Sequence, residues 1–133
     1  MLKRDDCIYY AGLIDGEGNI GFRKTRNSWQ PKIAVSNANR DVIDTLHREF
    51  PRGYLAIRHP KNENQHINYQ LSISRYDDCK DLLLLIEPYV KIKKVVASML
   101  LEFISNRKLR TPFTDREKDI IIRIREITNR RGS

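Results

Sequence analysis

Two acidic side chains stand close together in a glycine-rich segment near the start of the chain, Asp15-Gly16-Glu17-Gly18. They follow an apolar stretch that indicates a short helix over about residues 6–15, which places them at its carboxyl end. That end of a helix carries partial negative charge, so acids there are unfavourable unless a cation is bound. Hard divalent cations prefer carboxylate and carbonyl oxygens, and glycines let the backbone approach an ion closely. The segment therefore predicts a divalent-cation site.

A calcium-binding loop is an alternative interpretation of the same segment. Asp15, Glu17 and Asn19 alternate as the first ligands of such a loop do. However, Ile20 occupies the position that requires glycine, and Arg26 stands where a bidentate glutamate is needed. We reject this interpretation, which leaves a helix end with solvated acids as the plain alternative.

The chain is basic, and its positive charges are unevenly distributed. It has 25 Lys and Arg against 17 Asp and Glu, a formal net charge of +8 and a pI of about 9.7. Residues 18–40 contain no acid and five cations: Arg23, Lys24, Arg26, Lys32 and Arg40. Such a balance favours a polyanionic partner, with nucleic acid ahead of an anionic membrane. A solvated basic surface is the alternative.

Other features exclude several classes of protein. No stretch approaches the ~18 to 20 apolar residues that span a bilayer, and no apolar segment follows the basic N-terminus as in a secretory signal. We therefore expect no membrane partner. Cys7 and Cys79 form no CxxC pair, which favours a reduced interior over a disulfide framework.

The spacing of apolar residues predicts the helices and strands that position these acidic and basic side chains. We expect a single domain over residues 1–133, because 133 residues suffice for one core and no linker interrupts them. Alternating strand formers predict two hairpins, over residues 19–27 with 30–36 and over residues 54–59 with 67–74. Helical spacing predicts helices over residues 39–50, 77–87 and 91–106, and one that starts at a Thr114–Glu117 capping box. The order predicts an α+β fold, αββαββα with extra C-terminal helices, in which helices cover one face of a four-stranded antiparallel sheet.

The uncovered face of that sheet is expected to be polar and basic. Its predicted members, by strand parity, are Asn19, Gly21, Arg23, Thr25, Lys32, Tyr54, Arg58, Asn68 and Gln70. β-ribbons fit the major groove of DNA, where Arg pairs with guanine and Asn or Gln pairs with adenine. We therefore expect these residues, Gly21 apart, to bind double-stranded DNA.

The acidic segment resembles the signature of the LAGLIDADG homing endonucleases. In Tyr10-Ala11-Gly12-Leu13-Ile14-Asp15-Gly16-Glu17-Gly18, most positions match the family motif directly. Tyr10 replaces its first Leu, Gly16 its second Ala and Glu17 its final Asp, which keeps the carboxylate on a longer arm. With the order of strands and helices, the resemblance extends to about Asn106.

The resemblance implies roles for particular residues. Glu17 and the carbonyl of Gly16 are expected to bind Mg²⁺ at the scissile phosphates, while Asp15 is structural. A lysine from residues 88–94 is expected near the active site. Lys93 is our choice, with Lys91 and Lys94 as alternatives. Asn37, after the second strand, is the candidate for ordering water, and Arg40 is expected beside it and in contact with DNA.

One motif per chain implies a homodimer, because cutting both DNA strands needs two phosphodiester attacks. The small residues Ala11 and Gly12 let another helix come close. With Asp15, they are expected at an interface between motif helices in a saddle-shaped dimer. The expected function is a site-specific double-strand cut in a long near-palindromic DNA target, by metal-assisted hydrolysis.

Two alternatives stay open. The same fold could serve as an intron RNA maturase or as a DNA-binding protein that does not cut, in which case intron RNA is a possible partner. The second is a basic interaction domain whose motif resemblance is accidental. Metal dependence separates these, because cleavage needs Mg²⁺ and binding does not.

Overall fold

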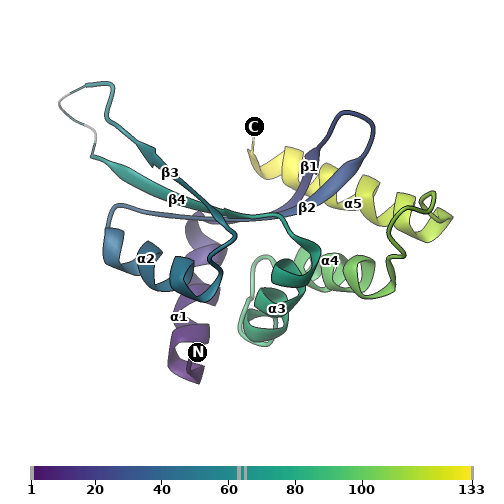
Figure 1. Ribbon diagram of the computed structural model, residues 1–133, viewed down its shortest axis with the longest axis horizontal. Helices are drawn as coiled ribbons and strands as arrows, with labels where there is room; N and C mark the ends of the chain where they lie inside the picture. The colour runs from purple at the N-terminus through teal and green to yellow at the C-terminus, as the bar shows by residue number, and fades with distance from the viewer. Residues whose placement is uncertain (1, 63, 65, 133) are drawn as a thin grey trace.

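A computed structural model describes residues 2–62, 64 and 66–132 of the chain (Figure 1). The elements are α1 Arg4–Glu17, β1 Asn19–Lys24, β2 Trp29–Asn37, α2 Arg40–Glu49, β3 Tyr54–Arg58, β4 Asn68–Ile73, α3 Tyr76–Ile86, α4 Lys94–Asn106 and α5 Asp115–Gly132. This is the predicted order of helices and strands. The largest differences at helix ends are in α1, which is longer at both ends, and α4, which begins three residues later than expected.

The four strands form one antiparallel sheet in the order β1-β2-β4-β3. In Figure 1 the sheet crosses the middle of the molecule, and α1 to α4 lie below it. The sheet's two hairpins meet along β2 and β4, where Ala34 pairs with Ser72. The expected α+β fold with a four-stranded antiparallel sheet is therefore confirmed.

The core lies between the sheet and α1 to α4. On the sheet, the alternating residues Ile20, Ile33, Val35, Leu71 and Ile73 are at most 2% exposed. The helices contribute buried side chains to the same core, among them Ile14, Ile43, Leu46, Leu82, Ile86, Leu100 and Phe103. Each fully buried aliphatic side chain of this kind contributes ~1.5 to 3 kcal/mol of burial. Period-two alternation thus decides which sheet face packs on helices.

Local capping sets where two helices begin. The Asn39 side chain accepts a hydrogen bond from the amide of Asp41 at 2.9 Å, at the start of α2. At the start of α5, Thr114 and Glu117 exchange bonds of 3.1 and 2.9 Å, which is the predicted capping box.

α5 is amphipathic and lies beside β1, an edge strand of the sheet (Figure 1). Ile120, Ile121 and Ile124 are buried, and the Arg125 guanidinium stacks 4.1 Å from the centre of the Trp29 ring in β2. No helix in the described part of the chain is both long and apolar enough to cross a membrane.

Candidate active site

A hollow of about 470 Å³ opens at the carboxyl end of α1. We call it the acidic pocket. Its lining comes from the end of α1, the start of β1, the turn before α4 and the last part of α5, and includes Gly16, Glu17, Asn19, Lys93, Ile127 and Thr128. The structure therefore brings the exposed acid of the motif next to the lysine chosen from the sequence.

Gly18 lets the end of α1 pass close to β2. A Cβ atom at this position would lie 2.7 Å from the Ile14 Cα and 2.9 Å from the Ala34 carbonyl oxygen. Both are backbone atoms and cannot rotate away. Gly16, in contrast, lies inside the helix, and a Cβ there would meet nothing within 4 Å. The helix therefore continues through Gly16 to Glu17, two residues beyond the end expected from the sequence, and Gly18 caps it.

Asp15 holds the turn that precedes α4. Its carboxylate accepts hydrogen bonds from the backbone amides of Lys91 at 2.7 Å and Lys93 at 3.0 Å. Burial acts to raise the pKa of Asp15, but the amides of Lys91, Lys93 and Ile92 and the charge of Lys93 together bring it below its usual value. Both carboxylate oxygens are thus engaged by this chain, which agrees with a structural role for Asp15.

The three candidate lysines have different surroundings. The Lys93 ammonium donates to the Asp15 main-chain oxygen at 2.8 Å and lies at the acidic pocket. The Lys94 ammonium is directed to Glu87, whose carbonyl lies at 2.7 Å and whose carboxylate lies at 3.1 Å. Lys91 is exposed and does not line the pocket. Geometry thus selects Lys93 over its neighbours.

Asn37 and Arg40 do not line the acidic pocket. The Asn37 side-chain oxygen accepts from the amide of Asn39 at 2.8 Å and so shapes the turn into α2. Arg40 pairs with Asp44 at 3.3 Å and lies 5.5 Å from the ring of Tyr69. Neither residue is therefore part of the acidic pocket, and their side chains make contacts at and just before the start of α2.

A second hollow, of about 240 Å³, lies on the side of the sheet opposite the core. We call this side the outward face. The hollow is lined by Arg23, Lys32, Tyr54, Arg58 and Gln70, together with Ala56, Ser72 and Ser74. Strand parity thus correctly placed these five expected DNA contacts on one surface.

The other expected members of the outward face have separate positions. Asn68 pairs with Arg58 across β3 and β4, and Asn19 lines the acidic pocket. Thr25 lies beyond the end of β1, where its amide donates to the Ser28 carbonyl at 2.9 Å. Gly21 is buried, because an added Cβ would lie 3.5 Å from Thr128 Oγ1 of α5. The outward face is therefore partly covered by α5 at this strand.

One side of α1 is exposed and bears small and apolar residues. Ile8 is 42% exposed, Tyr9 is 51% exposed, and a Cβ at Gly12 would meet nothing within 4 Å. Ala11, which we expected at an interface with Gly12, is fully buried in the core of its own chain. The interface assignment of Ala11 is thus incorrect, because one helical step of 100° turns it from the exposed side to the core.

Sequence reasoning missed two sets of residues. Ile127 and Thr128 reach the acidic pocket only because α5 folds back along β1, and no local pattern signals that contact. Gln30 is the second omission. It faces Arg23 across β1 and β2, and its alternation with Lys32 would have placed it on the outward face.

The sequence matches no family model and no curated protein sequence. Solved structures match the fold. Homing endonuclease I-CvuI, in complex with the I-CreI target and 2 mM Mg with its DNA not cleaved, has a TM-score of 0.63 at 14% identity over 98% of this chain and 99% of its own. Homing endonuclease I-TnaI has a TM-score of 0.58 at 23% identity over 78% of this chain and 72% of its own.

A third match is the LAGLIDADG meganuclease I-AabMI bound to uncleaved DNA, with a TM-score of 0.63 at 16% identity. The match covers 89% of this chain and 43% of the meganuclease. At these identities the likeness concerns the path of the backbone. The chain has the fold of the LAGLIDADG homing endonucleases.

Proposed function

We propose that this chain is a site-specific endonuclease that, as a homodimer, cuts both strands of a long near-palindromic DNA target. The observation that carries the proposal is the acidic pocket, which Glu17 and Lys93 both line, in a protein whose sheet also has a basic outward face. The fold supports it, since proteins with the same fold have been solved with DNA.

The outward face suits duplex DNA. Arg23, Lys32 and Arg58 converge on one hollow with Gln70, in a chain of net charge +8. Cations neutralise phosphates, while guanidinium and amide groups also match the donor and acceptor patterns of guanine and adenine in the major groove. The face can therefore supply both affinity and sequence preference.

The acidic pocket has donors that fit a divalent cation. Glu17 is exposed at the end of α1, and the Gly16 carbonyl is among the last four of the helix, which lack partners within it. Among the described residues, no three His, Cys, Asp or Glu side chains converge as a metal site. One chain therefore supplies few ligands, and DNA phosphates or a second copy must supply the rest. A bound Mg²⁺ would stabilise negative charge on the scissile phosphate.

The protein side chains have distinct roles in hydrolysis. The reaction adds water across a P–O3′ bond, so that the 3′ oxygen leaves with a proton and the phosphate stays on the 5′ end. The Lys93 ammonium stabilises charge that develops on the phosphate. Asp15 positions that lysine, because it binds the amides on both sides of Ile92. Glu17 contributes the carboxylate that binds the cation.

The exposed side of α1 fits a second copy of this chain. Ile8, Gly12 and Gly16 recur at four-residue spacing along this side, and neither glycine has a packing partner in its own chain at the Cβ position. Each glycine in a helix costs ~1 kcal/mol of stability relative to alanine. A close approach by another helix would explain why this side of α1 has two glycines. Two copies related by a twofold axis would bring both Glu17 residues to the centre of the DNA site.

Analytical ultracentrifugation on target DNA tests the dimer. The wild type should sediment as two copies per duplex. Gly12→Arg should sediment as one copy, because a long charged side chain blocks the helix approach. Ile122→Arg is the matched control, since Ile122 is 53% exposed on α5 and should leave the dimer intact. A wild type that binds its target as one copy would exclude the homodimer.

Cleavage of a randomised duplex library, with Mg²⁺ or with EDTA, tests the activity. The wild type should cut a near-palindromic sequence with Mg²⁺ only. Glu17→Gln should lose cutting by at least ~1,000-fold while it still binds the same DNA. Glu126→Gln is the matched control, because it also removes one carboxylate, at an exposed position on α5. This variant should still cut. If the wild type binds a site or intron RNA and cuts neither, the maturase or non-cleaving alternative replaces this proposal.

A further inference from the structure

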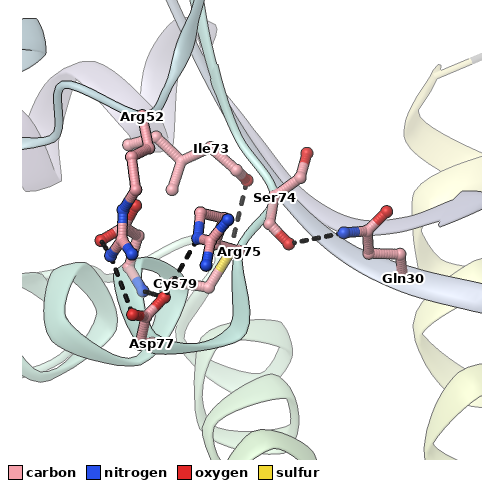
Figure 2. Close-up of polar contacts among 8 residues, drawn as sticks. Gln30, Arg52, Ile73, Ser74, Arg75, Asp77 and Cys79 are labelled. Carbon is pink, nitrogen blue, oxygen red and sulfur yellow. Dashed lines mark hydrogen bonds and ion pairs between the residues drawn. The ribbon is translucent and has the colours of Figure 1, made fainter.

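Gln30 links two parts of the outward face that are far apart in the sequence. It lies directly opposite Arg23 in the register of β1 and β2. The Arg23 guanidinium donates a hydrogen bond to Gln30 Oε1 at 3.1 Å. Gln30 Nε2 in turn donates to the Ser74 main-chain oxygen at 3.1 Å, the dashed line between the two residues in Figure 2.

These two bonds admit only one orientation of the Gln30 amide. A carbonyl oxygen accepts and cannot donate, so the nitrogen of Gln30 must face Ser74. A guanidinium only donates, so the oxygen of Gln30 must face Arg23. A reversed amide would lose both bonds, and the chain of contacts therefore holds Gln30 in place.

Ser74 itself lies on a well-anchored segment between β4 and α3 (Figure 2). On one side, Cys79 Sγ donates to the Ile73 carbonyl at 3.3 Å. On the other, the Cys79 amide donates to the Arg75 carbonyl at 2.8 Å, and the Arg75 side chain lies 3.8 Å from the Asp77 carboxylate. The Ser74 oxygen is therefore a fixed acceptor, and α3 indirectly orients Gln30.

An arginine that a neighbouring side chain already orders loses less conformational entropy on binding DNA than a flexible arginine does. A flexible arginine loses rotamer entropy when it becomes ordered on DNA. Arg23 engages one of its five N–H groups with Gln30, and the others remain for the two acceptors of a guanine. The Arg58 guanidinium, also on the outward face, has no hydrogen bond or ion pair with the described part of the chain.

We propose that Gln30 is a positioning residue that directs the Arg23 guanidinium to one base pair in each half-site and so determines sequence preference there. This rests on the proposed function, because it requires that the outward face binds DNA. Gln30 acts through Arg23 and reads no base itself. Its effect is therefore confined to the position that Arg23 contacts.

Selection of bound duplexes from a randomised library, with EDTA present so that no strand is cut, tests this proposal. Arg23→Ala first identifies the base pair that Arg23 reads. Gln30→Met, which keeps the length of the side chain without its hydrogen bonds, should lower the preference at that same base pair by about 5- to 10-fold. In the double variant, Gln30→Met should add nothing to Arg23→Ala.

Two controls separate positioning from a general loss of structure. Gln70→Met removes another outward-face glutamine and should change a different base pair. The melting temperature of Gln30→Met should stay within ~2 °C of the wild type, because partly exposed substitutions have small effects.

Several outcomes overturn the proposal. It fails if Gln30→Met changes a base pair that Arg23→Ala leaves unchanged, because Gln30 then reads DNA directly. It also fails if Arg23→Ala alters no position, or if Gln30→Met has no effect, while the wild type selects a site. A wild type that enriches no sequence would overturn the proposed function, and this inference with it.

Discussion

In the acidic pocket, groups from elements far apart in the sequence hold one another, whereas the outward face, outside the Arg23–Gln30–Ser74 contacts, presents exposed side chains on neighbouring strands. Asp15 alone binds the amides of Lys91 and Lys93, more than 70 residues away, and its main-chain oxygen binds the Lys93 ammonium. On the outward face, Tyr54 is 71% exposed. Chemistry requires charges fixed before the reaction, while recognition allows side chains to order on binding.

Gly18 links α1, which ends at the acidic pocket, to β1 of the sheet, and its substitution should have the largest effect. Gly18→Ala forces a Cβ against backbone atoms of Ile14 and Ala34, so we expect a loss of ~2 to 3 kcal/mol in the free energy of unfolding. Urea denaturation measures it. Gly16→Ala is the control, because that Cβ has free space and should not destabilise the protomer. Equal losses in both variants would contradict the close approach.

Lys93 should separate cutting from binding. We expect Lys93→Met to slow cleavage by ~100-fold, because the pocket loses its positive charge, with little change in DNA affinity. Lys94→Met removes the contacts of a 43% exposed lysine with the carbonyl and carboxylate of Glu87, outside the pocket, so cutting should stay within ~3-fold of the wild type. Single-turnover cleavage rates on pre-bound DNA compare the two. If Lys94→Met has the larger effect, the wrong lysine has been assigned to the pocket.

Asp15 should make the rigidity of the pocket depend on pH. Its folded pKa lies below the usual 3.8, so its stabilisation is present above that value and is lost as pH falls through the lower folded value. Relative to Asp15→Asn, we expect the wild type to be ~2 kcal/mol more stable at neutral pH. That advantage should shrink as the pH falls below 3.8. Urea midpoints across this range measure it, and a constant difference would contradict the role of the carboxylate.

Arg58 should show the opposite behaviour to the pocket residues. Arg58→Ala should weaken binding to the selected site by ~10-fold, through lost contacts to one base pair. The cleavage rate of bound DNA should not change, because Arg58 lies away from Glu17. Competition binding and single-turnover cleavage on the same duplex separate the two. A variant that binds normally and cuts slowly would break the division between the two regions.

Much of the fold could be predicted from the sequence because its signals are local. Alternation in β4 separates Leu71 and Ile73 from Gln70, and the structure keeps that division. Capping residues likewise act within one turn, which explains why Asn39 and the Thr114–Glu117 pair marked helix starts correctly. The acids at the end of α1 could also be recognised from the sequence, because acids at the carboxyl end of a helix are unfavourable whatever the rest of the fold is.

Other features depend on contacts between distant segments. The sequence could not separate Lys93 from Lys91 and Lys94 by its own pattern, because the choice depends on how the turn before α4 docks on Asp15. Nor could it show that Ala11 is buried while its neighbour Gly12 is exposed, since both are small residues of the same motif.

The α+β order, the two sheet faces and the acidic end of α1 are predictable from the sequence, because periodicity, caps and charge act over a few residues. The position of Lys93 at the pocket, the contacts of Asn37 and Arg40 around the start of α2, and the place of Thr128 in the pocket lining follow from the packing of distant elements. These depend on how whole elements pack, and packing sums many weak contacts that no short segment contains.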